Sequence, residues 1–325
     1  MQPNTSLITI DRNLEKIEQL LNELVLQPRI NALKWSEITK QTPSIKVGYP
    51  GQHLASLITG IPGDRTGARG HDLIDGSEVK SCSRIDQLDK CSECEAPVAR
   101  LEKACPKCGS SRIERKDDSK WLFTIRSEND LLVVTEEVER VLLILADYPN
   151  FQKQDYDTLR FQSFEIWTKS QRHVKFKEIL TNYYQNIYLK HKEKNYNKTP
   201  APYNFWPYKY QFYLCNPILT FSCVVHNASL IPKIDIEHYT EPCTDRASIP
   251  SIGMPLRILK EAEQILLVQN ASLSSIKSLP QDIDEELRAY LPLRVTREIA
   301  STSQNYKRRA RTPRGTNQTT IFDTD

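Results

Sequence analysis

The chain has 325 residues, of which 39% are hydrophobic and 26% are charged, and its formal net charge is +3. A chain of this length can bury a sizeable core, and its apolar runs are too short to cross a bilayer, which argues against a membrane protein or a membrane partner. It lacks the positively charged start and apolar stretch of a signal peptide, so we expect a cytoplasmic location.

The first 45 residues are predicted to form a helical segment. Residues 11–27 place five apolar side chains on one stripe of a helix, and Asp11 stands where an N-terminal cap would. A second helix is predicted over 31–40. The stretch 44–70 is rich in turn residues and is predicted to hold a short helix around 52–59.

A charged cluster follows at 71–82, with the sequence HDLIDGSEVKSC. Mg²⁺ prefers oxygen ligands, often one or two carboxylates, and it can polarise a phosphodiester and lower the pKa of an attacking water. A nearby lysine can orient that water, help to deprotonate it or neutralise developing negative charge. Glu78 and Lys80 are two residues apart, so both point to one face of a strand, with Val79 turned into the core.

The first carboxylate depends on how this segment turns, which we predict to be a tight β-hairpin. A three-residue loop that ends at Gly76, in the left-handed conformation, pairs Asp72 with Glu78 and brings Asp72 to the face of Lys80. A two-residue turn instead points Asp72 away and makes Asp75 the candidate carboxylate. The sequence leaves both registers open.

Four of the eight cysteines form two Cys-x2-Cys pairs separated by ten residues. In a cytoplasmic chain this spacing predicts a tetrahedral zinc site rather than disulfides. Because all four ligands come from the protein, the zinc is expected to be structural. The predicted ligands are Cys91, Cys94, Cys105 and Cys108, in an insertion over 90–116.

The segments on either side of the insertion predict a mixed α/β layer structure. Residues 120–127 and 159–169 have the apolar, aromatic and alternating pattern of strands, whereas 128–146 combine a helical apolar pattern with strand-like pieces. We therefore expect a core over 46–175 with a mixed sheet flanked by helices.

Two further segments carry concentrated positive charge. Residues 183–213 hold eleven aromatics mixed with five lysines, a composition that suits contacts along a nucleic-acid backbone and equally suits a tyrosine-rich region packed on the core. We assign 176–292 to DNA recognition or dimerisation and 293–325 to a basic, flexible tail. The candidate DNA contacts are Arg65, Arg69, Lys307, Arg308, Arg309 and Arg311.

The pattern Asp72…Glu78-Val79-Lys80 resembles the signature of the PD-(D/E)xK nuclease superfamily, in which an acidic residue precedes an (E/D)-x-K strand. Residues 48–128 more widely resemble type II restriction endonucleases of the MamI kind, through GYPGQHLASL, ARGHDLIDGSEVKSCSR, the cysteine pairs and SKWLFTIRSE. The resemblance implies that Asp72 and Glu78 bind Mg²⁺ and that Lys80 serves the attacking water.

This chain departs from the superfamily pattern at two positions. Members often add an acidic residue from the preceding helix, where this chain has Gln52, which we take as a candidate helper. The usual proline before the first acidic residue is replaced by His71.

The expected function is Mg²⁺-dependent, sequence-specific hydrolysis of double-stranded DNA by a type II restriction endonuclease, leaving 5′-phosphates. The resemblance also implies a restriction-endonuclease-like core and a homodimer, because a palindromic DNA site asks for a two-fold symmetric protein. Two alternatives remain: a repair or structure-specific nuclease with the same core, and a non-catalytic zinc-ribbon DNA-binding protein. An HNH nuclease fits poorly, because no histidine lies between residues 72 and 172.

Overall fold

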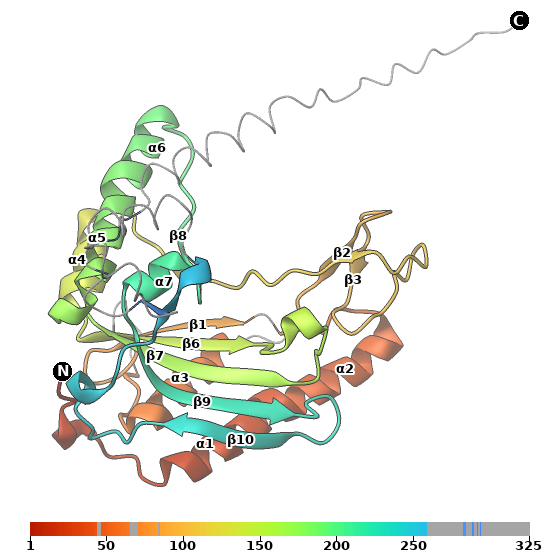
Figure 1. Ribbon diagram of the computed structural model, residues 1–325, viewed down its shortest axis with the longest axis horizontal. Helices are drawn as coiled ribbons and strands as arrows, with labels where there is room; N and C mark the ends of the chain where they lie inside the picture. The colour runs from red at the N-terminus through yellow and green to blue at the C-terminus, as the bar shows by residue number, and fades with distance from the viewer. Residues whose placement is uncertain are drawn as a thin grey trace, which may run out of the picture.

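The computed structural model describes residues 1–43, 47–65, 71–83 and 85–258, and in addition residues 282, 283, 288, 291 and 293. Within them, a five-stranded sheet carries helices on both faces (Figure 1). This confirms the mixed sheet flanked by helices that the sequence predicts. In the same part of the chain, every helix is too short or too polar to cross a membrane.

The sheet has the strand order β1-β6-β7-β9-β10. Its strands are β1 (Glu78–Ser83), β6 (Arg140–Asp147), β7 (Leu159–Trp167), β9 (Ile218–His226) and β10 (Lys233–Tyr239). β1 runs parallel to β6, and the remaining neighbours are antiparallel. All residues of β6 are buried, because both faces of the sheet are covered, which explains its unbroken apolar run.

Three helices cover one face of the sheet: α1 (Asn13–Leu21), α2 (Gln27–Thr39) and α3 (Gly48–Thr59). Apolar side chains of α1, of the π-helical turn Asn22–Leu26 that follows it and of α3 pack with those of β1, β6, β7 and β9 in one continuous core, whereas the buried residue of α2 is Arg29. The helices predicted over 11–27 and around 52–59 are confirmed, whereas the separate helix predicted over 31–40 is the second half of one helical run from Asn13 to Thr39. The predicted cap is wrong, since Arg12 takes the cap position at φ 47° and Asp11 pairs with Lys16 instead.

The opposite face is covered by α4 (Glu128–Leu132), α5 (Val174–Asn182), α7 (Tyr210–Leu214) and the strand pair β5 (Trp121–Phe123) and β8 (Tyr203–Phe205). Helix α6 (Lys190–Lys194) projects away from the sheet and buries none of its residues (Figure 1). The core on this face is rich in aromatic rings, and seven of the eleven aromatics of 183–213 are buried in it: Tyr183, Tyr188, Tyr203, Phe205, Tyr210, Phe212 and Tyr213. The indole of Trp121 stacks on Phe212 and donates its N–H to the Ile144 carbonyl at 2.9 Å.

The segment 128–146 divides into a helix and a strand. Helix α4 continues as a π-helical turn over Val133–Glu137, and the chain then extends into β6. The apolar pattern of its second half belongs to a strand buried on both faces, which sequence periodicity does not separate from a buried helix.

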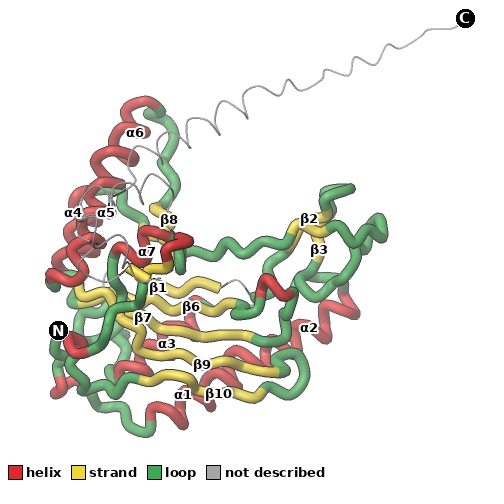
Figure 2. The backbone as a smooth tube through the Cα atoms, in the orientation of Figure 1, coloured by secondary structure: helices red, strands yellow, loops and turns green. Residues whose placement is uncertain are grey.

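Two smaller sheets complete the fold. β2 (Asp89–Cys91) pairs with β3 (Pro97–Val98) and β4 (Ile113–Glu114), in a loop-rich element that stands to the right of the main sheet (Figure 2). β11 (Met254–Pro255) pairs with β12 (Asp282–Ile283).

Candidate active site and metal centre

Three segments meet at the N-terminal end of β1: helix α3, the turn over 71–77 and the strand itself. Helix α3 passes so close to β1 that a Cβ on Gly51 would lie 2.0 Å from Ser81 Oγ, so this crossing needs a glycine. The next residue on the helix is Gln52, whose side chain reaches the turn.

The carboxylate of Asp72 links these three segments. Its Oδ2 accepts the backbone N–H of Val79 at 2.7 Å, and its Oδ1 accepts Nε2 of Gln52 at 2.8 Å. Among the described strands β1 lies at the edge of the sheet, so Asp72 supplies the acceptor that a neighbouring strand would otherwise offer to Val79. These two hydrogen bonds therefore hold the Asp72 carboxylate beside the edge of β1 that faces away from β6.

The side chains of Glu78 and Lys80 extend from the N-terminal end of β1 into a cavity. The ammonium of Lys80 donates to Glu78 Oε1, and the two side chains are 30% and 13% exposed respectively. Both line a cavity of about 380 Å³ whose base is apolar and includes Phe123 and Val134. The predicted strand alternation is confirmed: Glu78 and Lys80 face the cavity, and Val79 between them is buried against α3.

Asp75 is directed away from this group. Its Oδ2 accepts Nη2 of Arg140 at 2.9 Å and its Oδ1 accepts the backbone N–H of Ser77 at 3.0 Å. Its side chain is only 8% exposed. The structure therefore bonds Asp72 to Gln52 and Glu78 to Lys80 at the start of β1, and it leaves Asp75 in the protein interior.

The predicted hairpin over 71–82 is wrong. β1 pairs with β6, with Glu78 opposite Val141, and residues 71–77 form a turn rather than a strand. The local turn signal is real, since Gly76 has φ +82° and the N–H groups of Asp72 and Leu73 both donate to the Ser77 carbonyl. The apolar strand β6 is the better partner for β1, because it buries the face that carries Val79.

Sequence reasoning missed two polar residues of the same cavity. Arg126 and Asn129 line it together with Glu78 and Lys80, and both are exposed. They follow β5, which contacts β1, so their place at the site depends on how two distant strands pack. The sequence has no local motif that would identify them.

The four predicted zinc ligands converge. All four sulfurs lie within 4.8 Å of one another, with 3.6 Å between Cys91 and Cys108 and 3.6 Å between Cys94 and Cys105. Four sulfurs about 2.3 Å from a tetrahedral zinc ion lie about 3.8 Å apart, so the cluster fits this metal. Burial opposes ionisation of Cys105, but the N–H groups of Cys108 and Lys107 outweigh it and lower its pKa to about 7. The Ser110 N–H lowers the pKa of Cys108, but the neighbouring sulfurs and burial outweigh it and raise that pKa to about 12, so metal binding would have to displace the proton of this thiol.

A buried ion cluster joins this cysteine element to the core. Asp89 accepts Nη1 of Arg115 at 2.8 Å and pairs with Arg100 at 3.2 Å. The guanidinium of Arg100 lies 5.4 Å from the ring centroid of Tyr156 and 5.0 Å from that of Phe151, both in the connection between β6 and β7. The element is thus packed against the core and not held by its two chain ends alone.

The candidate DNA contacts are only partly within the described residues. Arg65 is exposed and follows Asp64, whose N–H donates to the Asp72 carbonyl at 2.9 Å, so it lies close to the site. Arg69 and the tail residues Lys307, Arg308, Arg309 and Arg311 lie outside the described residues.

Comparison with known proteins gives one family. The MamI restriction endonuclease family matches residues 34–257, which is more than half of the chain. The type II restriction enzyme MamI of Microbacterium ammoniaphilum is 32% identical over 83 residues. That match covers 26% of this chain and 27% of the enzyme, so it spans about a quarter of each. No solved structure matches.

Proposed function

This chain belongs to the MamI restriction endonuclease family, and from that premise we propose that it is a type II enzyme that cuts double-stranded DNA at a specific sequence with Mg²⁺, leaving 5′-phosphates. The observation that supports the proposal is that two bonded pairs, Asp72 with Gln52 and Glu78 with Lys80, both lie at the start of β1. We propose on the same ground that the sheet and its helices are a PD-(D/E)xK core.

The residues present suit a hard divalent cation. Asp72 and Glu78 offer carboxylate oxygens and Gln52 offers an amide oxygen, which is the donor chemistry that Mg²⁺ prefers. We assign the first carboxylate to Asp72 and not to Asp75, because the charge of Asp75 is already paired with the buried Arg140, whereas Asp72 bonds only uncharged groups, the Gln52 amide and the Val79 N–H. When bound, Mg²⁺ polarises the scissile phosphate and lowers the pKa of the attacking water.

Three side chains then act on the reaction. Gln52 donates to Oδ1 of Asp72, which fixes the orientation of that carboxylate. Lys80 donates to Glu78, which holds its ammonium where it can orient the water and balance negative charge on the phosphate. Arg126, exposed at the rim of the cavity, would bind a neighbouring phosphate of the DNA strand.

The cysteine element would hold a structural zinc ion, since its four thiols close the site and its base is anchored by Asp89. We further propose that the enzyme works in the cytoplasm as a homodimer, with Arg65, Arg69 and the basic tail on the DNA.

The test is incubation of the purified protein with plasmid and phage DNA, with and without Mg²⁺. Discrete bands support a restriction enzyme, a smear supports an unspecific nuclease, and shifted but uncut DNA supports a binding protein. Glu78→Ala and Lys80→Ala should each abolish cutting and spare DNA binding. The matched controls are Glu136→Ala and Lys177→Ala, an exposed pair at 2.7 Å, which should cut normally. Full activity in Glu78→Ala or Lys80→Ala would refute the site.

A further inference from the structure

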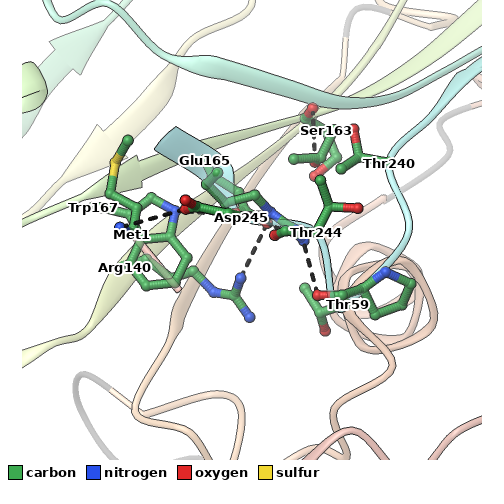
Figure 3. A network of polar contacts seen from close by, with 12 residues as sticks. Met1, Thr59, Arg140, Ser163, Glu165, Trp167, Thr240, Thr244 and Asp245 are labelled. Atoms are coloured by element: carbon green, nitrogen blue, oxygen red, sulfur yellow. Dashed lines mark hydrogen bonds and ion pairs between the residues drawn. The ribbon is translucent and has the colours of Figure 1, made fainter. Parts of the chain in front are cut away.

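A buried polar network joins the turn over 71–77 to the sheet, and Figure 3 shows the part of it around Glu165. Arg140, the first residue of β6, is fully buried. Its Nε donates to Ser77 Oγ at 3.0 Å and its Nη2 to Asp75 Oδ2 at 2.9 Å. Its Nη1 donates to Glu165 Oε1 at 3.1 Å. Every nitrogen of this guanidinium is therefore engaged inside the protein, and two of the three hold the turn.

The far end of the network is fixed in the sheet. Glu165 on β7 is fully buried, accepts the indole N–H of Trp167 at 2.7 Å and pairs with Arg246 at 3.2 Å. Figure 3 shows Arg140, Glu165 and Trp167 grouped together. Burial alone would raise the pKa of Glu165, but the charges of Arg140 and Arg246 outweigh it and lower that pKa. With Asp75, two arginines face two carboxylates, so the buried charges balance.

The turn held by this network separates the two proposed metal-binding carboxylates. The N–H of Asp72 donates to the Ser77 carbonyl at 2.8 Å, and the N–H of Glu139 donates to the Gly76 carbonyl at 3.1 Å. Glu78 follows Ser77 directly in the chain. A change in the conformation of the turn therefore changes the separation of the two carboxylates.

We propose that Arg140 is a positioning residue for the metal site: it holds the turn in the conformation in which Asp72 and Glu78 bind one cation. This inference rests on the proposed function, and Arg140 itself touches neither the cation nor the DNA. An arginine is needed because its planar fork reaches three acceptors at once, which a lysine ammonium does not reproduce. Loss of a residue that orients metal-binding side chains typically weakens metal affinity or activity by about 10- to 100-fold.

The experiment compares Arg140→Lys and Asp75→Asn with the control Asp147→Asn. Asp147 ends β6 and binds Arg160 through two hydrogen bonds of 2.9 and 2.7 Å, so the control breaks a similar pair at the opposite end of the same strand. Two quantities are measured on the zinc-loaded full chain: the Mg²⁺ concentration for half-maximal cleavage, and the affinity for Mn²⁺ by calorimetry without DNA.

Both network variants should raise the half-saturating Mg²⁺ concentration, and weaken Mn²⁺ binding, by about tenfold or more. Ser77→Ala, which removes one bond of Arg140 and leaves all charges in place, should shift both values in the same direction by less. The control should lower the melting temperature but leave both values unchanged within about twofold, because distant sites act independently.

Equal metal dependence in Arg140→Lys and in the control overturns the proposal. A shift in Asp75→Asn alone also overturns it, because Asp75 would then be a ligand itself. If Arg140→Lys fails to fold, Ser77→Ala decides, and wild-type values in it refute the positioning role. A wild-type protein that binds Mn²⁺ without cutting any DNA refutes the proposed function alone, and calorimetry of the variants still decides the inference; a wild-type protein that binds no Mn²⁺ refutes both.

Discussion

Removal of the Asp86 carboxylate should destabilise the whole molecule. Asp86 receives Nε and Nη2 of Arg29 at 2.8 and 3.1 Å, and neither side chain of the pair is exposed. Burial alone would lower the pKa of Arg29, but the charge of Asp86 outweighs it and raises that pKa. In Asp86→Ala a buried cation is left without its partner, which costs about 3–5 kcal/mol.

The assay is equilibrium unfolding in urea. With a slope of about 3 kcal/mol per molar, this loss lowers the midpoint by about 1–1.7 M. Glu136→Ala, which breaks the half-exposed pair with Lys177, should leave the midpoint unchanged. The double variant Arg29→Met, Asp86→Ala should recover part of the loss, because no unpaired charge remains buried. The reasoning is refuted if Asp86→Ala lowers the free energy of unfolding by less than about 1 kcal/mol, or if the double variant loses more of it than Arg29→Met and Asp86→Ala lose together.

Three other outcomes are expected. Chelation of the metal, or Cys94→Ser, should unfold the cysteine element and lower the melting temperature, and the intact protein should contain about one zinc per chain by elemental analysis. The pKa of Glu165 is lower in the folded protein than the unfolded value near 4.5, so its ionised form stabilises the fold above that value, and this stabilisation is lost as the pH falls through the folded pKa. Between pH 5 and pH 3 the melting temperature of Glu165→Gln should therefore fall less than that of wild type. Gly51→Ala should cost about 1–3 kcal/mol by pushing α3 off β1, whereas Gly48→Ala, with nothing within 4 Å, should not.

The sequence predicts those features whose geometry is local. Each cysteine pair closes within its own turn, with the Gly109 N–H on the Cys105 carbonyl at 2.9 Å, so spacing alone identifies the cluster. Glu78 and Lys80 share a face because a strand has a period of two, whatever its partner. β6 was harder to predict, since an apolar run buried on both faces carries no alternation.

The parts that the sequence could not supply depend on contacts between distant segments. Arg140 lies 65 residues from Asp75, and Arg246 lies 81 residues from Glu165. A single arginine in an apolar run gives no sign of which carboxylate it will meet. Arg126 was missed for the same reason, because it reaches the cavity through the packing of β5 beside β1.

The place of the first carboxylate shows how sheet order decides a site. A hairpin with a three-residue loop would have set Asp72 opposite Glu78, but the chain instead pairs β1 with β6, and no other described strand pairs with β1. The Val79 N–H on the other edge of β1 donates to the Asp72 carboxylate. In an interior strand this N–H would instead bond a carbonyl of the neighbouring strand. Among the described residues no further strand pairs with that edge, and loop residues contact it, with Ser119 Oγ donating to the Ser83 carbonyl at the far end of β1. The order of the strands thus decides where the proposed metal ligand Asp72 is held.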